Sequence, residues 1–372
     1  MKKIMFLLAT VTLFLIGCGG KKDAASSDVI KIGVIAPLTG DLAQYGTPAK
    51  DGFQLKVDEI NAAGGINGKK IELVIEDNKG DVNESVSIFK KLKGQDKVDM
   101  IVGPIISSTS NAVAPLAQLG KVVMITPTGT NIYITKGRDF VFRTTFTDPY
   151  QGTAAAKYAA KNGIKKVAIL TNTASDYSVG LAAAFKDEAA KSGIEVVEEK
   201  YTKDDKDFKA ILTNIKNKAP EAIFIPDYYN TIGLIATQAK EIGIKALYLG
   251  GDGWDGVQKD FSDVTEGAVF ASQFAADDTS ELVQKFISAY KTKTNSDANV
   301  FAALGYDTGS IVGAALKNAK DMTPESIRDA VKAVSLDLVT GKLVFDADRN
   351  PQKAVTFVEV KGGKVVLKEK VE

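Results

Sequence analysis

The chain has 372 residues, of which 45% are hydrophobic and 25% are charged, and its formal net charge is +1. This length exceeds what one hydrophobic core usually serves, so we expect two domains or lobes. The sequence has no basic stripe, which argues against a nucleic-acid partner. It also has no histidine, which excludes Ser-His-Asp and Cys-His mechanisms and a His-based zinc site.

The N-terminus indicates a targeting segment. Lys2 and Lys3 precede an apolar run at residues 4–16 that is too short to span a bilayer. The run ends in Leu-Ile-Gly-Cys18, which resembles the lipobox of bacterial lipoproteins. The resemblance implies a signal peptide at 1–17, cleavage before Cys18 and acylation of that cysteine, followed by a flexible tether to residue 28. A short transmembrane anchor is the alternative. Because Cys18 is the only cysteine, we expect no disulfide and no metal site in the folded part.

From residue 29 onward, predicted strands and helices alternate. Strands are expected at 29–36, 71–76, 100–103 and 122–126, separated by helices at 47–63, 82–92 and 111–119. After 140–144 the pattern restarts, with helices at 151–161, 177–192, 208–216 and 231–242 and strands at 167–171, 196–201, 222–226 and 246–250. A strand at 269–274, helices at 280–293 and 300–320, a helix opening at Pro324 and a β-rich end at 342–368 complete the chain. Such alternation predicts α/β architecture with parallel, doubly wound sheets.

The long helical patterns after the second unit suggest that the chain returns to complete the first lobe. We therefore expect lobe 1 at 29–146 plus 276–348, and lobe 2 at 147–275 plus 349–372. Lobes that exchange chain several times leave a cleft bridged by crossing segments, and such a hinge favours open–closed motion around a ligand.

The stretch 101–130 carries the first candidate site. It reads as a strand, a run of hydroxyl residues, a helix, a second strand and another hydroxyl-rich turn. Both turns leave the carboxyl end of a strand, where open α/β sheets bind ligands. The hydroxyls at 107–110 stand where the helix should begin, beside unpaired backbone N–H groups, and this suits a carboxylate or another small anion. The alternative is that these hydroxyls only cap the helix.

Asp252 is the second candidate, because it follows a strand and stands among glycines that let a ligand approach the backbone. Its carboxylate suits a ligand cation, and an Asp in a Gly-rich turn is the alternative. The stretch from Gly251 to Gly256 formally matches the dinucleotide pattern GxGxxG. However, residues 257–265 are too short and polar for the helix that this motif requires, so we expect no nucleotide cofactor.

Several aromatic residues follow strands as well, namely Tyr45, Tyr177, Tyr228, Tyr229 and Trp254. A single aromatic residue in a loop is ordinary packing. Several at the ligand-facing ends of strands predict the apolar wall of a pocket.

Together these stretches resemble the bacterial branched-chain amino-acid-binding proteins, the type I periplasmic-binding-protein family of ABC importers. The likeness runs from about residue 29 to 360 and includes KIGVIAPLTGDLAQYG, DEINAAGGINGKKIELVIEDN, GPIISSTS, MITPTGTNIYIT, FRTTFTDPYQG and IPDYYN. It implies two Rossmann-like lobes with parallel doubly wound sheets joined by a multi-segment hinge. It also implies a binding role without catalysis, cofactor or metal.

The resemblance assigns roles for an α-amino acid ligand. Ser107, with Ser108 beside it, stands where a hydroxyl and a backbone N–H hold the ligand carboxylate. Thr130 stands where a threonine contacts both the carboxylate and the ammonium group, and Thr128 where a backbone carbonyl accepts an ammonium hydrogen. Asp252 stands where the family has an acidic residue, often Glu, that pairs with the ammonium.

Tyr45, Tyr177 and Tyr228 match aromatic positions around the ligand side chain, and Trp254 is added because it is close to Asp252. We therefore expect an extracytoplasmic, lipid-anchored monomer that captures an α-amino acid, with leucine, isoleucine and valine favoured, and delivers it to a membrane ABC permease. One alternative is a receptor of the same fold for an aromatic amino acid, an amide or a carboxylate. The other is an enzyme that uses Asp252 and a tyrosine.

Overall fold

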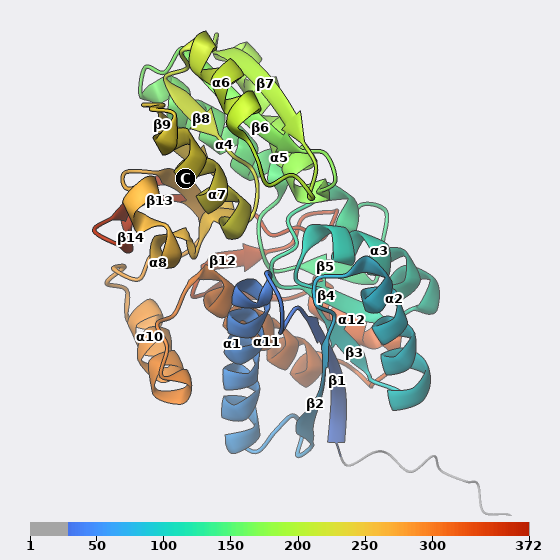
Figure 1. The fold of residues 1–372 in the computed structure, drawn as a ribbon. Helices are drawn as coiled ribbons and strands as arrows, with labels where there is room; N and C mark the ends of the chain where they lie inside the picture. The colour runs from blue at the N-terminus through green and yellow to red at the C-terminus, as the bar shows by residue number, and fades with distance from the viewer. Residues whose placement is uncertain (1–28, 372) are drawn as a thin grey trace, which may run out of the picture.

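The computed structural model describes residues 29–371, which form two lobes (Figure 1). The first lobe is a five-stranded sheet and the second lobe a seven-stranded sheet, each with the helices packed on it. The predicted signal peptide, Cys18 and the tether lie outside the described residues. Within 29–371 no helix combines the length and apolar character needed to cross a membrane.

The first lobe has a wholly parallel sheet in the order β2-β1-β3-β4-β5. Its strands are β1 (Val29–Ala36), β2 (Lys70–Asp77), β3 (Met100–Val102), β4 (Val123–Thr126) and β5 (Val141–Arg143). Its other elements are α1 (Ala43–Ala62), α2 (Val82–Lys91), η1 (Leu92–Asp96), α3 (Ser107–Gly120), η2 (Ile132–Ile134), α10 (Glu281–Thr294), α11 (Val300–Asn318), α12 (Pro324–Lys332) and the hairpin of β11 (Ser335–Leu338) and β12 (Gly341–Val344).

The first sheet is buried on both faces, which explains why its strands read as continuous apolar runs. Helices α1, α11 and α12 pack on one face, and α2 and α3 pack on the other. In Figure 1 the late helices α11 and α12 lie beside the early elements of this lobe. The late helices α11 and α12 thus pack on the first sheet.

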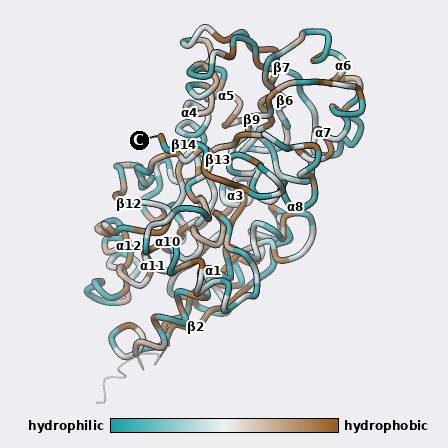
Figure 2. Tube along the Cα trace, turned by 90° about the vertical axis from the view of Figure 1, so that its left-hand side faces the viewer, coloured by the Kyte–Doolittle hydropathy of each residue, from teal (hydrophilic) through white to brown (hydrophobic). Residues whose placement is uncertain are grey.

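The second lobe has the strand order β14-β13-β10-β9-β8-β6-β7. Its strands are β6 (Lys166–Asn172), β7 (Glu195–Tyr201), β8 (Ala222–Phe224), β9 (Leu247–Gly250), β10 (Val269–Ser272), β13 (Val355–Lys361) and β14 (Lys364–Val371). Its helices are α4 (Asp148–Lys161), α5 (Asp176–Lys191), α6 (Lys209–Lys218), α7 (Tyr229–Glu241), η3 (Asp252–Trp254), α8 (Val257–Asp260) and α9 (Ser262–Thr265). Figure 2 shows the hydropathy of both lobes along the chain.

The second sheet departs from the predicted parallel arrangement at one edge. Strand β13 runs antiparallel to β10, and β14 runs antiparallel to β13. The chain reaches β13 directly from the first lobe, without the crossover helix that a parallel neighbour would need. The lobes are joined by this segment and by those between β5 and α4 and between β10 and α10. The boundaries that we predicted for the lobes stay a prediction.

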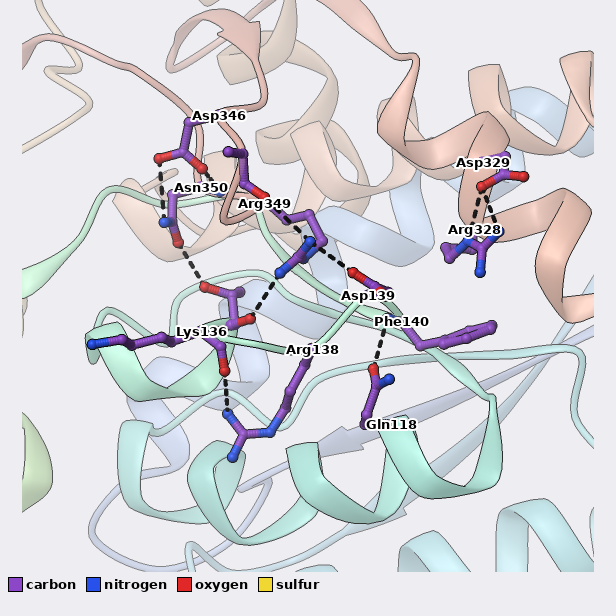
Figure 3. Close-up of polar contacts among 12 residues, drawn as sticks. Gln118, Lys136, Arg138, Asp139, Phe140, Arg328, Asp329, Asp346, Arg349 and Asn350 are labelled. Carbon is purple, nitrogen blue, oxygen red and sulfur yellow. Dashed lines mark hydrogen bonds and ion pairs between the residues drawn. The ribbon is translucent and has the colours of Figure 1, made fainter.

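The segment that leads to β13 is tied to the first lobe by polar contacts (Figure 3). Arg349 is 6% exposed and donates to the Asp139 carboxylate (3.1 Å) and to the Thr135 carbonyl oxygen (3.2 Å). The Thr135 hydroxyl donates to the Asn350 side-chain oxygen (2.8 Å), and the Asn350 N–H donates to Asp346 (2.9 Å). The segment that enters the second lobe is therefore held against the first lobe at Arg349 and Asn350.

Helices α1 and α11 approach each other through glycines. A methyl group on Gly305 would lie 2.0 Å from the Ala49 carbonyl oxygen, and one on Gly52 would lie 2.0 Å from the Ala302 carbonyl oxygen. Because both carbonyl oxygens belong to helix backbones, no rotation of a side chain can relieve the overlap. These glycines therefore set the distance between the two helices.

We expect Gly305→Ala to lower the free energy of unfolding by about 1–3 kcal/mol, because the helices must separate to admit the methyl group. Urea unfolding measures the change. Gly94→Ala is the matched control, since a methyl group there meets no atom within 4 Å. Equal effects of the two substitutions would contradict the close-packing argument.

Candidate functional site

A small cavity lies between the lobes, at the carboxyl ends of the parallel strands. Its lining comes from both lobes. The lining residues are Tyr45, Ile105, Ile106, Ser107, Thr128, Thr130, Tyr177, Tyr228, Asp252, Gly253 and Phe301. The structure thus brings together most of the predicted site residues, from loops that are far apart in the sequence.

The first lobe contributes hydroxyl and N–H groups to this cavity. Ser107 is the first residue of α3, and no side chain caps this helix. The N–H groups of its first turn are therefore left for another partner, and the positive end of the helix dipole favours an anion there. The Ser107 hydroxyl accepts hydrogen bonds from the N–H groups of Thr130 and Asn131, both at 3.3 Å, and lies 3.4 Å from the Thr130 hydroxyl. This corner suits a carboxylate.

Two of the predicted hydroxyl residues have structural partners. The Thr128 hydroxyl donates to the Ile105 carbonyl oxygen at 2.6 Å, although Thr128 also lines the cavity. Ser108 is absent from the cavity lining, and its hydroxyl accepts the Asp176 N–H of the second lobe at 3.3 Å. In this structure Ser108 is thus a contact between the lobes.

The second lobe contributes a buried carboxylate, Asp252, which is 4% exposed. Its side chain accepts a hydrogen bond from the Gln151 amide at 3.1 Å. Burial raises the pKa of Asp252 to about 6, and hydrogen bonding by Gln151 and Tyr177 opposes this rise. Asp252 is therefore mainly ionised at neutral pH, and it presents a negative charge to the cavity, which has no Lys or Arg among the described residues that line it.

Aromatic rings form the rest of the wall. The Tyr177 and Tyr228 rings are stacked with 5.2 Å between their centroids. The centroid of the Tyr45 ring lies 5.4 Å from that of Tyr228 and 4.7 Å from that of Phe301. The Tyr45 hydroxyl donates to the Gly253 carbonyl oxygen at 2.7 Å, which joins the two lobes across the site. The wall is thus largely apolar, and the hydroxyls of Tyr45 and Tyr177 are already engaged in hydrogen bonds.

Trp254 requires a correction, because the structure places it outside the cavity. Its indole N–H donates to the Ile225 carbonyl oxygen at 2.7 Å, and its ring stacks on Phe270 in the core of the second lobe. A methyl group on Gly250 would lie 2.0 Å from the indole, so glycine is needed to admit the ring. The GxGxxG match therefore reflects close packing around a turn, and only the four-residue α8 follows it.

The lobes are closed over the cavity by polar contacts at its edge. The Asn111 amide donates to the Asp176 carboxylate at 2.8 Å, and the Asn131 amide donates to the Asp176 carbonyl oxygen at 2.9 Å. Because Asp176 begins α5 of the second lobe and both asparagines belong to the first, the described state has a closed cleft.

Three further residues belong to this site but were not predicted from the sequence, namely Phe301, Gly253 and Gln151. Phe301 lies in the first turn of α11, and Gln151 lies in α4. Neither residue directly follows a strand, so the signal that identified the tyrosines was absent. Gly253 lies beside Asp252 and could have been found from its position in the same turn.

The chain was compared with known proteins. A model of the periplasmic binding protein family matches residues 29–364. The Leu/Ile/Val-binding protein BraC3 of Rhizobium johnstonii is 32% identical, over 97% of this chain and 100% of that protein. The branched-chain amino acid transporter substrate-binding protein LivJ of Streptococcus pneumoniae, solved in complex with isoleucine, is 38% identical with a TM-score of 0.85. That match covers 91% of this chain and 99% of LivJ.

A third relative has a different kind of ligand. This solute-binding protein of an ABC transporter from Rhodopseudomonas palustris was solved with 3,4-dihydroxybenzoic acid. It is 28% identical with a TM-score of 0.85, over 93% of this chain and 98% of that chain. The predicted fold class is confirmed by these matches. Since the family model spans most of the sequence, the chain belongs to the periplasmic binding protein family.

Proposed function

We propose that the protein captures an α-amino acid with an aliphatic, branched side chain outside the cytoplasm and delivers it to a membrane ABC permease. The observation that carries this proposal is that groups suited to an anion and a group suited to a cation face the same cavity. Ser107, Thr130 and the start of α3 face it from the first lobe, and the ionised Asp252 faces it from the second. A zwitterion loses much hydration on burial, so both of its charges need charge-assisted hydrogen bonds.

The site residues have the following proposed roles. Ser107 and Thr130 bind the carboxylate, and the Thr128 backbone carbonyl and Asp252 bind the ammonium group. The rings of Tyr45, Tyr177 and Tyr228 enclose the side chain. Because the two ends of the ligand contact different lobes, binding stabilises the closed state.

The alternative ligand class is an aromatic acid like the one bound by the Rhodopseudomonas palustris relative. Such a ligand has no cation, so it would leave the buried Asp252 carboxylate unpaired. The small cavity, lined by Ile105 and Ile106 as well as by aromatic rings, also suits a compact aliphatic side chain. Both features favour the amino acid.

Calorimetric titration with L-leucine, L-isoleucine, L-valine, L-phenylalanine and 3,4-dihydroxybenzoate tests the ligand class. The protein is first unfolded and refolded to remove any copurified ligand. We expect micromolar or tighter binding of at least one branched-chain amino acid and no heat with dihydroxybenzoate. Binding of dihydroxybenzoate without binding of any branched-chain amino acid would establish the aromatic-acid alternative.

We also propose a lipid anchor at Cys18, a monomeric state and no catalytic role. The lipobox-like segment supports the anchor, and the absence of histidine supports binding without chemistry. In a bacterium that processes lipoproteins, the parent protein should enter the detergent phase on Triton X-114 partition. The Cys18→Ala variant should either stay in its unprocessed form or, if it is processed, leave the detergent phase. If the processed forms of both proteins entered the detergent phase equally, the proposal of a lipid anchor at Cys18 would be wrong.

A further inference from the structure

A second buried acid lies behind Asp252. Asp148 is the first residue of α4, is 0% exposed and is absent from the cavity lining. The Gln151 side-chain amide donates to the Asp252 carboxylate at 3.1 Å and to the Asp148 carboxylate at 3.4 Å. The Gln151 side-chain oxygen in turn accepts the Asp252 N–H at 3.1 Å. One amide thus connects two buried acids and the backbone of the η3 turn.

The surroundings of Asp148 compensate a negative charge only in part. One of its carboxylate oxygens is buried with no hydrogen-bond partner among the described residues. The nearby Arg143 guanidinium donates instead to the carbonyl oxygens of Gly129 and Asn131, at 2.8 Å each, and to the Thr135 hydroxyl at 3.1 Å. A charged group in this position would be costly, whereas a neutral acid is tolerated.

The neighbouring polar and charged groups act in both directions, and burial outweighs them. Burial raises the pKa of Asp148 to about 8; the Thr130 hydroxyl, the Arg143 guanidinium and the Gln151 amide oppose this rise, and the negative charge of Asp252 adds to it. Tyr177 and Tyr228 also face the pair, and burial raises the pKa of both phenols well above the usual range, so they stay neutral. Asp148 is therefore protonated at neutral pH while Asp252 is mainly ionised.

Ionisation of Asp148 would add a second negative charge near Asp252 in the closed cleft, whereas a protonated Asp148 adds none. A bound zwitterion has no net charge, so it would not offset that additional charge.

We infer that Asp148 and Asp252 form an acid pair that holds one proton, and that Gln151 is the positioning residue that keeps the ionised member, Asp252, turned toward the ligand. All three residues lie on elements of the second lobe, so the pair persists when the lobes separate. The inference deepens the proposed function, because the ammonium partner is then prepared before the ligand arrives.

The first experiment needs no ligand, so its failure is distinct from failure of the proposed function. The full chain, solubilised in detergent, is labelled with carboxyl-¹³C aspartate and titrated by NMR, and Asp148→Asn and Asp252→Asn identify the two signals. We expect Asp148 to titrate at a higher pH than Asp252 and above the ordinary value of about 3.9. In Asp148→Asn the midpoint of Asp252 should not move. The proposal of an acid pair that holds one proton would be overturned if Asp148 titrated at a lower pH than Asp252, or if the titration midpoint of Asp252 fell in Asp148→Asn.

The second experiment tests Gln151. Affinity for the ligand identified by calorimetry should fall about tenfold per pH unit below the pKa of Asp252, because only the carboxylate pairs with ammonium. In Gln151→Leu this acid limb should move upward by about one pH unit, since the amide no longer favours the ionised form.

Gln238→Leu is the matched control for a merely structural effect. Gln238 is also buried in the second lobe, where it accepts the Phe208 N–H at 2.7 Å and donates to the Lys206 carbonyl oxygen at 2.8 Å. We expect this control to lose stability and to keep the acid limb in place. An unmoved limb in Gln151→Leu would overturn the positioning role.

Discussion

Replacing Asp252 with asparagine is expected to weaken the binding of a branched-chain amino acid about a hundredfold at pH 7, or roughly 3 kcal/mol. The substitution keeps the shape of the side chain but removes the only carboxylate among the described residues that line the cavity. The ligand ammonium would then be buried without its charge partner. Calorimetric titration of parent and variant measures the ratio of dissociation constants.

Asp260→Asn is the control for this prediction. Asp260 ends α8, a few residues after Asp252, and is exposed, so its charge is screened from the cavity by water. We expect its affinity to match that of the parent. A loss of less than fivefold in Asp252→Asn would show that the ammonium group is held elsewhere.

The largest effect on stability is expected at a buried ion pair between α11 and the segment that leads to β13. Lys353 and Asp307 have side chains that are 0% and 1% exposed, with 3.9 Å between the Lys353 nitrogen and the Asp307 carboxylate. Asp307 also accepts the N–H groups of Val339 and Thr340 at 2.9 Å and the Thr340 hydroxyl at 2.6 Å. Asp307→Ala should therefore lower the free energy of unfolding by about 3–5 kcal/mol. It leaves a buried ammonium group without its carboxylate partner and three hydrogen-bond donors without their acceptor.

Lys353→Met is the matched comparison in urea unfolding. In this variant Asp307 keeps its hydrogen-bond donors from residues 339 and 340, so we expect a smaller loss than in Asp307→Ala. If the two variants lost equal stability, the donors to Asp307 would carry none of the effect.

The same pair gives a pH dependence with a definite sign. Burial lowers the pKa of Lys353 to about 8, and Asp307 opposes that change. In the unfolded chain a lysine keeps its proton up to about 10.4. Between these values the unfolded chain holds more protons, so the contribution of Lys353 to stability rises with pH. Lys353→Met should lack this rise, which unfolding experiments at pH 8 and pH 10 can measure.

Much of the fold could be predicted from the sequence, because buried parallel strands leave a direct pattern. The strand at 29–36 was predicted with the bounds that β1 has, and the late helices were assigned to the first lobe. Helix boundaries were predicted less closely. Helix α1 begins at Ala43, earlier than the predicted residue 47, and it includes Tyr45, which packs in the core and also lines the cavity. The antiparallel edge of the second sheet depends on a chain crossing that has no local signature.

The candidate site was predictable where it depends on strand ends. Ser107, Thr130, Asp252 and the tyrosines reach one cavity because parallel strands bring their carboxyl ends to one edge. The direction of a single side chain after a strand is not encoded in that way. Trp254 turns into the core, where Gly250 leaves room for its ring. Residues supplied by helices, such as Phe301 and Gln151, need the packed structure.

The most direct test of a zwitterion site between the lobes compares three ligands of one shape. L-leucine, 4-methylpentanoate and 3-methylbutylamine share the branched side chain, but the second lacks the ammonium group and the third lacks the carboxylate. Calorimetry on refolded protein should give micromolar or tighter binding for leucine and at least a hundredfold weaker binding for each of the others. Comparable affinity of leucine and either analogue would contradict recognition of both charges in this cavity.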